Sequence, residues 1–423
     1  MNLQFWMTIR RRIPIFLLLI SATGCSRPDN RTVAVLTGAD RVAAGEKALL
    51  LGKRVGLITN HTGITRDGRH IADVLHEDKQ IELAALFGPE HGIRGRAEAG
   101  ERVESDIDEA TGLRVFSLYG RTRKPTPDML DGLDVLAFDI QDVGTRFYTY
   151  ISTMSLAMEA AAEKGIPFVV LDRPNPIGGV LVEGPVLDPA LRSFVGIHPI
   201  PLRHGMTVGE LARMFNEEGW LKNGVYAELH VIPMQGWKRS MLYDETGLKW
   251  IAPSPNMPKL QTALLYPGMG LLEATNFSEG RGTDRPFERV GAPWLDSEAV
   301  IHELRGQFGD EIEFQPVTFV PKDIPGKATN PKFEGETCQG IRFTVRDGHR
   351  LQAVKLGFAL ILALQKHHAD VFHIHDPRMH LMSGQRWVAG ALKQGATADE
   401  LISRWQPDVE QFLQLRSKYL LYE

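Results

Sequence analysis

The sequence contains only two cysteines, Cys25 and Cys338, so at most one internal disulfide could form. The charges are almost balanced, with 48 lysines and arginines against 52 aspartates and glutamates and a formal net charge of −4. Because nucleic-acid binding needs a basic surface, we expect no nucleic-acid partner. Hydrophobic residues make up 43% of the chain and charged residues 24%, which is typical of a soluble globular protein.

The sequence also lacks the motifs of several common chemistries. No GxGxxG turn opens a helix after the first predicted strand, which excludes a nicotinamide or flavin enzyme. His61 and His91 stand in none of the HxH, HExxH or CxxC patterns of metal sites, and we predict no metal and no cofactor. A GxSxG nucleophile elbow is missing as well, which argues against serine peptidase chemistry.

Residues 1–25 have the composition of an export signal. Three arginines, 10–12, precede an apolar run, 13–20, which is too short to span a bilayer as a helix, since that takes about 20 residues. The sequence ATGC at 22–25 is similar to a bacterial lipobox, although alanine stands where leucine is commoner. We therefore expect lipidation of Cys25, with residues 26–32 as a tether, and an exported lipoprotein anchored to the membrane and facing the periplasm or the cell exterior. An ordinary cleaved signal is the alternative.

The first half of the chain alternates predicted strands and helices. Strands are expected at 54–59, 81–87, 113–117, 134–140, 167–171 and 229–233, and helices at 71–76 and 152–164. Nearly continuous apolar strands alternating with helices indicate a parallel sheet covered on both faces, so we predict a Rossmann-like α/β domain over residues 33–258. The proline-rich stretch 253–258 reads as a rigid connector. A strand at 340–345 and a helix at 351–367 predict a smaller α+β auxiliary domain over 259–423.

Polar side chains follow four of these strands, where ligands of open α/β sheets bind. The most informative segment is 87–95, with the sequence FGPEHGIRG, in which a Gly-Pro turn precedes Glu90, His91 and Arg94. Each cluster alone could be a turn or capping device. Four in register, rich in carboxylates, arginine and asparagine, favour a sugar or peptide site. The other three clusters are Asn60 and His61; Asp139, Gln141, Asp142 and Arg146; and Asp172, Arg173 and Asn175.

These segments resemble one known family, the NamZ-type exo-β-N-acetylmuramidases. The matching segments are GPEHGIRG at 88–95, FDIQDVGTRFYTY at 138–150, DRPNP at 172–176, VEGP at 182–185, HGMT at 204–207, PSPNMP at 253–258 and NFSEGRGT at 276–283. The resemblance implies release of N-acetylmuramic acid from the non-reducing ends of peptidoglycan fragments. It also implies a Rossmann-like domain and an auxiliary C-terminal domain with the site in the cleft between them, and a catalytic glutamate at Glu90.

Glycosidic cleavage normally needs one carboxylic acid that protonates the leaving oxygen and a second carboxylate that acts as nucleophile or base. Glu90 is the predicted acid. His91 beside it is also predicted to be catalytic, and His91 and Arg94 could shift the pKa of Glu90 in opposite directions. Asp142 is the leading choice for the second carboxylate together with Asp139, followed by Glu183 and Glu279. The N-acetyl group of the substrate could replace this second carboxylate, as in substrate-assisted glycosidases.

The loop at 273–283 is expected to supply the other wall of the cleft. Arg281 is our candidate for the lactyl carboxylate of muramic acid, because a guanidinium binds a carboxylate in a bidentate fork. Tyr266, Phe287 and Trp294 could stack on the sugar face, although each ring alone is more often a core residue. The substrate-binding set predicted in this way comprises Asn60, His61, Arg94, Asp139, Gln141, Arg146, Asp172, Arg173, Asn175, Glu183, Asn276, Glu279 and Arg281.

Two rival functions fit parts of the sequence. A non-catalytic lipoprotein that binds cell-wall fragments would explain the polar sheet edge and the tether equally well. A peptidoglycan amidase or peptidase is the weaker alternative, because it would need the nucleophile elbow or the metal motif that the sequence lacks.

Overall fold

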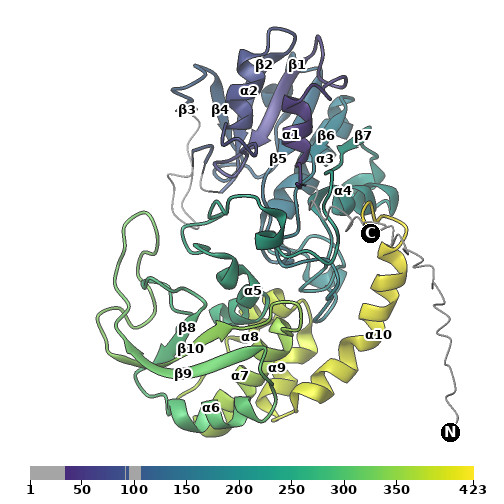
Figure 1. The fold of residues 1–423 in the computed structure, drawn as a ribbon. Helices are drawn as coiled ribbons and strands as arrows, with labels where there is room; N and C mark the ends of the chain where they lie inside the picture. Colours follow the sequence, from purple (N-terminus) through teal and green to yellow (C-terminus); the bar gives the residue numbers. More distant parts are fainter. Residues whose placement is uncertain (1–33, 91, 95–105) are drawn as a thin grey trace, which may run out of the picture. The chain divides into compact units, whose positions relative to one another are not determined.

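A seven-stranded sheet, in the order β3-β4-β2-β1-β5-β6-β7, dominates the first half of the computed structural model (Figure 1). The structure describes residues 34–90, 92–94 and 106–423. All neighbouring strands are parallel except β3, which runs antiparallel to β4 at the edge. The predicted parallel α/β sheet is therefore confirmed, and the short antiparallel edge strand is an addition. The strands are β1 (Arg54–Thr59), β2 (Glu82–Gly88), β3 (Asp106–Ile107), β4 (Arg114–Ser117), β5 (Val135–Asp139), β6 (Phe168–Leu171) and β7 (Leu229–Ile232).

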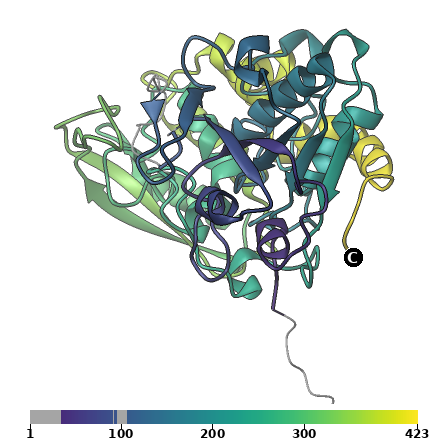
Figure 2. The same ribbon diagram turned by 90° about the horizontal axis from the view of Figure 1, so that it is seen from above.

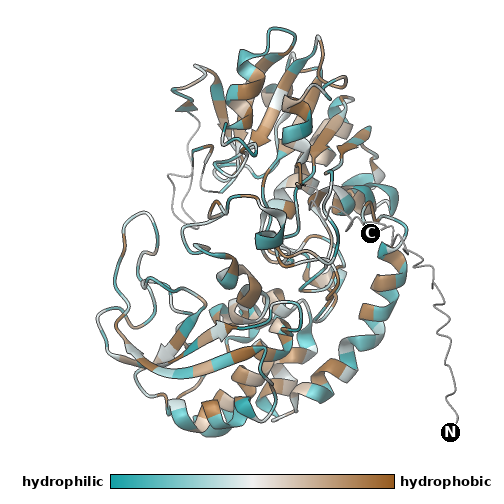
Figure 3. Cartoon of the chain, viewed as in Figure 1, coloured by the Kyte–Doolittle hydropathy of each residue, from teal (hydrophilic) through white to brown (hydrophobic). Residues whose placement is uncertain are grey.

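Helices cover both faces of this sheet (Figure 2). On one face, Leu57 of β1 packs in a core with α1 (Gly38–Ala43) and α2 (Ile71–Glu77). Its neighbour Ile58 points to the opposite face and packs in a core with α3 (Tyr150–Lys164) and α4 (Val208–Glu217). Because successive side chains of a strand alternate between the faces, a strand buried on both must be hydrophobic throughout. The predominantly hydrophobic colouring of the central strands in Figure 3 follows from this requirement.

The strand order changes direction next to β1. The chain runs outward from β1 to β2 and β4 on one side, and from β5 to β6 and β7 on the other. The carboxyl ends of β1 and β5 are therefore neighbours at a topological switch point, the position where open α/β sheets usually bind ligands.

The second half contains a smaller antiparallel sheet, in the order β8-β10-β9, packed with helices. Its core joins α5 to α7, and two glycines make this contact possible: a Cβ on Gly268 would lie 1.9 Å from the Ala353 carbonyl oxygen, and one on Gly357 2.4 Å from the Gly268 oxygen. The α+β character predicted for this half is confirmed. The elements are α5 (Leu260–Met269), β8 (Arg289–Ala292), α6 (Ser297–Arg305), β9 (Ile312–Phe319), β10 (Cys338–Val345), α7 (Ala353–His367), α8 (Asp376–Ser383), α9 (Arg386–Lys393) and α10 (Ala398–Arg416). Short 3₁₀ helices are η1 (Pro127–Leu130), η2 (Pro189–Leu191), η3 (Lys222–Gly224), η4 (Tyr243–Thr246) and η5 (Gly270–Ala274).

The last helix, α10, returns the chain to the first half (Figure 1). Phe412 packs in the core beneath α3 and α4, and the Arg416 guanidinium donates to the carbonyl oxygens of Gly179 and Gly205, each over 3.0 Å. Beyond the helix, the Tyr422 hydroxyl donates to Asp172 Oδ2 over 2.5 Å. The end of the chain thus stabilises the large sheet, although the predicted domain boundary assigns it to the second half. That boundary, at residues 258 and 259, stays a prediction.

Candidate functional site

A cavity of about 610 Å³ is lined by both halves of the chain. The first half contributes Glu90, Tyr119 and residues 147–149, and the second contributes Tyr266 and charged residues of the loops around 273–281 and 327–332. Its walls therefore combine carboxylate, aromatic and basic groups. Such a mixture suits a polar ring-shaped ligand, which offers hydroxyl groups at its rim and an apolar face.

Glu90 reaches the cavity from the turn after β2. Gly92, with φ of +68°, lets this turn close through a hydrogen bond from its N–H to the Pro89 oxygen over 3.0 Å, because glycine adopts positive φ without steric cost. Thr149, the residue before α3, donates its hydroxyl to Glu90 Oε2 over 3.2 Å. Burial raises the pKa of Tyr119 to about 12, and the charge of Glu90 and a hydrogen bond to it add to the shift. The Tyr119 phenol therefore stays protonated at neutral pH.

Aromatic rings form one wall of the cavity. Tyr266 lies edge-on to Phe147, with ring centroids 5.1 Å apart, and to Tyr148 at 5.9 Å. Of the three rings that could stack on a sugar, Tyr266 lines the cavity. The other two are core residues, which is the alternative that the sequence left open. Phe287 is buried behind Tyr266, and Trp294 packs against Phe277 and His368 outside the cavity, so the apolar cores of the second half hold both.

Ion pairs form the wall opposite the first half. Arg281 donates to Glu273 over 2.9 Å and lies 3.4 Å from Glu279, and Lys332 pairs with Glu279 at 2.9 Å. Arg378, from the first turn of α8, donates to Glu273 over 3.0 Å. Burial raises the pKa of Glu273, but the positive charges of Arg281 and Arg378 outweigh burial and leave that pKa below its ordinary value. Glu279 and Arg281 thus line the cavity as predicted, but they already bind each other.

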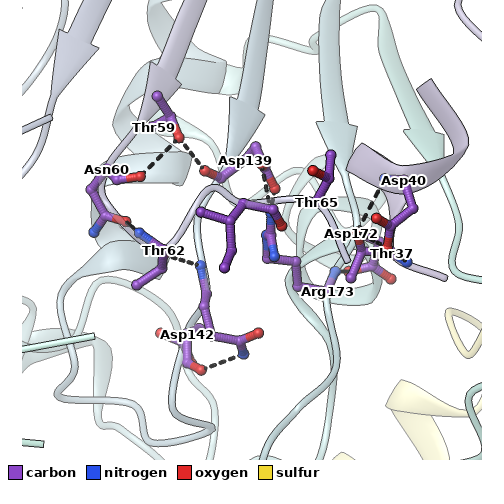
Figure 4. A network of polar contacts seen from close by, with 12 residues as sticks. Thr37, Asp40, Thr59, Asn60, Thr62, Thr65, Asp139, Asp142, Asp172 and Arg173 are labelled. Carbon is purple, nitrogen blue, oxygen red and sulfur yellow. Dashed lines mark hydrogen bonds and ion pairs between the residues drawn. The ribbon is translucent and has the colours of Figure 1, made fainter. Parts of the chain in front are cut away.

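The residues at the switch point come together, but they bind one another (Figure 4). Arg173 forms two hydrogen bonds with Asp139, of 2.5 and 2.8 Å, and donates to the Ile64 oxygen over 3.0 Å. Asp139 is fully buried and Arg173 is 3% exposed. Neither lines the cavity. The protein's own side chains therefore fill the place where an open α/β sheet usually binds its ligand.

Asn60 and Gln141 belong to the same buried network. Asn60 Oδ1 accepts hydrogen bonds from the N–H and hydroxyl of Thr62, over 2.9 and 2.6 Å, and the same hydroxyl accepts from the backbone N–H of Gln141. The Gln141 side chain donates to the carbonyl oxygens of Asp142 and Pro174. These contacts fix the loops after β1 and β5 to each other. The sequence correctly predicted that the two clusters meet, and the cavity lies elsewhere.

Asp142 lies in this buried region and does not line the cavity. The Gly144 N–H donates to its Oδ2 over 2.7 Å, and among the described residues its Oδ1 is buried without a hydrogen-bond partner. Burial raises the pKa of Asp142 to about 7, against the opposing effect of the Gly144 and Val143 N–H groups. The charge of Asp142 is one contribution to the raised pKa of Tyr148, which lines the cavity, and burial is the largest cause of that shift.

The remaining predicted ligands also lie outside the cavity lining. Arg94 pairs with Asp108 and Asp73, Arg146 donates to the carbonyl oxygens of Pro185, Ile200 and Met382, and Asp172 accepts from Thr207, Gly209 and Tyr422. Asn175 donates to Met206, Glu183 pairs with Arg203, and His61 contacts the Ala252 oxygen. Asn276 holds the segment before α8 through Val371 and His373. His91 and Cys25 lie outside the described residues.

The sequence missed Tyr119, Lys332 and Arg378 as members of the cavity. No pattern marks them, because they reach the cavity from loops and a helix end whose positions depend on tertiary packing. Glu273 belongs to the polar loop predicted at 273–283. Its ion pairs with two arginines could not be predicted from the spacing of residues in the sequence. Within the described ranges, no group of three or more His, Cys, Asp or Glu side chains is arranged to hold a metal ion. None of the helices in that part of the chain is long and apolar enough to cross a membrane.

Two protein-family models match most of the chain. The family model described as exo-β-N-acetylmuramidase NamZ, N-terminal, matches residues 55–261, and its C-terminal counterpart matches residues 264–422. The chain belongs to the NamZ family. It is 46% identical over 389 residues to the peptidoglycan β-N-acetylmuramidase NamZ of Bacillus subtilis (strain 168), covering 92% of this chain and 91% of the relative.

Two solved structures share the NamZ-family fold seen here. Both are crystal structures of DUF1343 family proteins from Bacteroides fragilis NCTC 9343. The first has a TM-score of 0.85 and 38% identity and covers 92% of this chain and all of its own. The second has a TM-score of 0.75 and 35% identity and covers 92% of this chain and 99% of its own. Both halves of the fold are therefore shared by these relatives.

Proposed function

We propose that this protein is an exo-acting glycoside hydrolase that releases N-acetylmuramic acid from the non-reducing ends of peptidoglycan fragments. Membership of the NamZ family supports the reaction and the substrate. The observation that carries the assignment of the site is the position of Glu90, which lines the cavity between hydroxyl, aromatic and charged side chains.

Glu90 acts in this proposal as the general acid. It gives a proton to the glycosidic oxygen as the bond from the sugar C1 to that oxygen breaks. Thr149 and Tyr119 position its carboxyl group by hydrogen bonds. The aromatic wall with Tyr266 receives the apolar face of the sugar ring.

The second catalytic group is the N-acetyl oxygen of the substrate. Each of the other two carboxylates in the described lining, Glu273 and Glu279, is bound by two basic side chains, which makes it a poor nucleophile. The acetamido oxygen would bond to C1 as the leaving group departs. Water would then open this ring intermediate and return a proton to Glu90. In this scheme Asp142, buried outside the cavity, supports the site without touching the sugar.

The export signal and the lipobox-like segment support a further part of the proposal. We infer that the protein is exported and anchored to a membrane through lipid on Cys25, where it meets peptidoglycan fragments outside the cytoplasm.

A chromogenic β-glycoside of N-acetylmuramic acid tests the reaction. Release of the chromophore that persists in EDTA supports the glycosidase, and loss of release in EDTA would indicate a metal-dependent enzyme. Binding of muramoyl fragments without any release would identify a cell-wall-binding protein. The exo mode is tested with a disaccharide that begins with N-acetylmuramic acid and a trisaccharide in which N-acetylglucosamine precedes it. Only the disaccharide should be cleaved.

A further inference from the structure

The cavity carries an excess of positive charge. Among the described residues that line it, four basic side chains face three carboxylates. A polar cavity with this imbalance favours a negatively charged ligand, because the ligand pairs with the positive groups that have no carboxylate partner. The seven groups are Arg281, Lys327, Lys332 and Arg378, and Glu90, Glu273 and Glu279.

Two of the basic groups already bind other groups of the protein. Lys332 has three N–H donors, and it uses them on the oxygens of Leu272, Phe277 and Glu279 over 2.8, 3.0 and 2.9 Å. Arg281 lies between Glu273 and Glu279, and its guanidinium stacks over a phenylalanine ring with 5.3 Å to the centroid. The role that we predicted for Arg281 in binding a substrate carboxylate therefore competes with two ion pairs.

Arg378 is differently placed. Its guanidinium has five N–H donors, and among the described residues it makes one hydrogen bond, to Glu273 over 3.0 Å. Its side chain is 41% exposed, against 25% for Arg281. The fourth basic group, Lys327, makes one long contact of 3.4 Å to the Thr283 oxygen, and as a point charge it lacks the fork that binds both oxygens of a carboxylate.

The segment that carries Arg378 is fixed to the cavity wall. The Asn276 side chain donates to the Val371 oxygen and accepts from the His373 N–H, both over 2.8 Å, and the His375 N–H donates to the Ala274 oxygen over 2.8 Å. These bonds tie the start of α8 to the loop after η5. Asn276, which we predicted to bind substrate, thus fixes the segment that leads to Arg378 and does not itself line the cavity.

Arg378 and Glu90 line the same cavity and influence the same two tyrosines. The charges of Arg378 and Glu90 both act on the Tyr119 phenol, whose pKa burial raises most, and both act on Tyr266. The two tyrosines line the same cavity as the two charged groups. A sugar ring held against Tyr266 would therefore have the acid and the guanidinium at different points of its rim.

We propose that Arg378 binds the lactyl carboxylate of N-acetylmuramic acid and is the residue that selects this sugar over N-acetylglucosamine. The assignment rests on the proposed muramidase function, and it replaces Arg281 in this role. The carboxylate would take the donors of Arg378 that do not face Glu273, and its charge would reduce the positive excess in the cavity.

The test compares three chromogenic β-glycosides in the full-length protein: N-acetylmuramic acid, its methyl ester and N-acetylglucosamine. The ester keeps the size of the lactyl group and removes its charge. We expect wild type to favour the acid over the ester in kcat/KM by at least tenfold, and we expect this ratio of acid to ester to fall to about one in Arg378→Ala. Arg378→Lys should recover part of the preference. Lys393→Ala is the matched control. Lys393, on α9, forms an ion pair of 2.5 Å with Asp376, which lies on α8 like Arg378, and Lys393 does not line the cavity.

Each outcome decides a different point. A wild type that cleaves none of the three glycosides contradicts the proposed function itself. A wild type that cleaves acid and ester equally contradicts any carboxylate site. Equal losses on acid and ester in Arg378→Ala would show that Arg378 only supports the fold. If Arg378→Ala keeps the preference and Lys327→Ala or Arg281→Ala loses it, the carboxylate is bound by that other residue.

Discussion

The Thr149 hydroxyl lies 3.2 Å from Glu90 Oε2, and this contact joins the turn after β2 to the start of α3. The two residues are 59 positions apart in the chain. The orientation of the carboxyl group therefore depends on an element outside its own loop. Changes at Glu90 and at Thr149 separate the chemistry of the carboxyl group from its positioning.

Glu90→Gln should abolish turnover and leave the fold intact. The amide keeps the size of the side chain and an oxygen that accepts from Thr149, but it has no acidic proton to give. We expect kcat on the N-acetylmuramic acid glycoside to fall at least tenfold, which is a rise of about 1.4 kcal/mol in the barrier. Circular dichroism and the unfolding midpoint should match wild type. A variant with more than a tenth of the wild-type kcat would refute the assignment.

Thr149→Val should lower kcat with little change in KM. Valine keeps the shape of threonine and removes the hydroxyl, and a typical hydrogen bond contributes about 0.5–1.5 kcal/mol. Because only orientation is lost, we expect a smaller effect than in Glu90→Gln. Thr149→Ser is the control, since it restores the donor. Equal activity in the Val and Ser variants would show that the contact has no part in catalysis.

The fold was predictable because the strands carry strong local signals. The strand predicted at 54–59 has the bounds of β1, and the runs at 81–87 and 134–140 contain most of β2 and β5, since strands buried on both faces are hydrophobic throughout. The helix predicted at 152–164 starts two residues late, because Tyr150 and Ile151 follow an N-cap without a side-chain hydrogen bond.

The site was predictable only in part. Parallel strands bring their carboxyl ends to one edge, so the sequence correctly placed Asn60 and Asp139 near each other. Whether such side chains face a ligand or one another depends on pairing across the fold. Asp139 and Arg173 neutralise each other, and no local pattern distinguishes that pairing from a binding site. Arg378 is harder still, because the packing of α8 against η5 alone brings it to the cavity.

Arg173→Ala should strongly destabilise the fold. It leaves Asp139 buried without its cationic partner, and breaking one side of a buried ion pair costs about 3–5 kcal/mol. Urea unfolding measures the loss. Arg350→Ala is the comparison, because Arg350 forms exposed pairs with Asp310 and Asp347, and removing these should change stability little. A similar small loss for both variants would mean that Asp139 finds another partner or takes up a proton.

Cys25→Ser should release the protein from membranes. Serine cannot receive the thioether-linked lipid that the lipobox-like segment predicts, so the variant should appear in the soluble fraction with unchanged specific activity. Fractionation followed by a salt wash checks this. A variant that still sediments with membranes after the wash would contradict the lipid anchor, and wild type in the soluble fraction would indicate an ordinary cleaved signal.

Asp142→Asn should stabilise the protein near neutral pH more than in acid. Burial raises the pKa of Asp142 to about 7, above its ordinary value of about 4, so the folded protein holds this proton more tightly than the unfolded chain. The stability that the protonated group provides is fully present below pH about 4 and is lost as the pH rises through about 7. Asparagine imitates the neutral acid at every pH and still accepts from the Gly144 N–H.

The free energy of unfolding, measured in urea at several pH values, decides this prediction. The difference between Asp142→Asn and wild type should grow by more than about 1.4 kcal/mol, one pKa unit, between acid and neutral pH. Asp131→Asn is the control, because this side chain is 69% exposed and its substitution should give a difference that hardly depends on pH. A constant difference for Asp142→Asn would show that the N–H groups of Gly144 and Val143 keep the carboxylate ionised.

The same variant tests whether Asp142 takes part in catalysis. Because Asp142 does not line the cavity, kcat of Asp142→Asn should fall less than kcat of Glu90→Gln. An equal loss would return Asp142 to the catalytic centre as the second carboxylate.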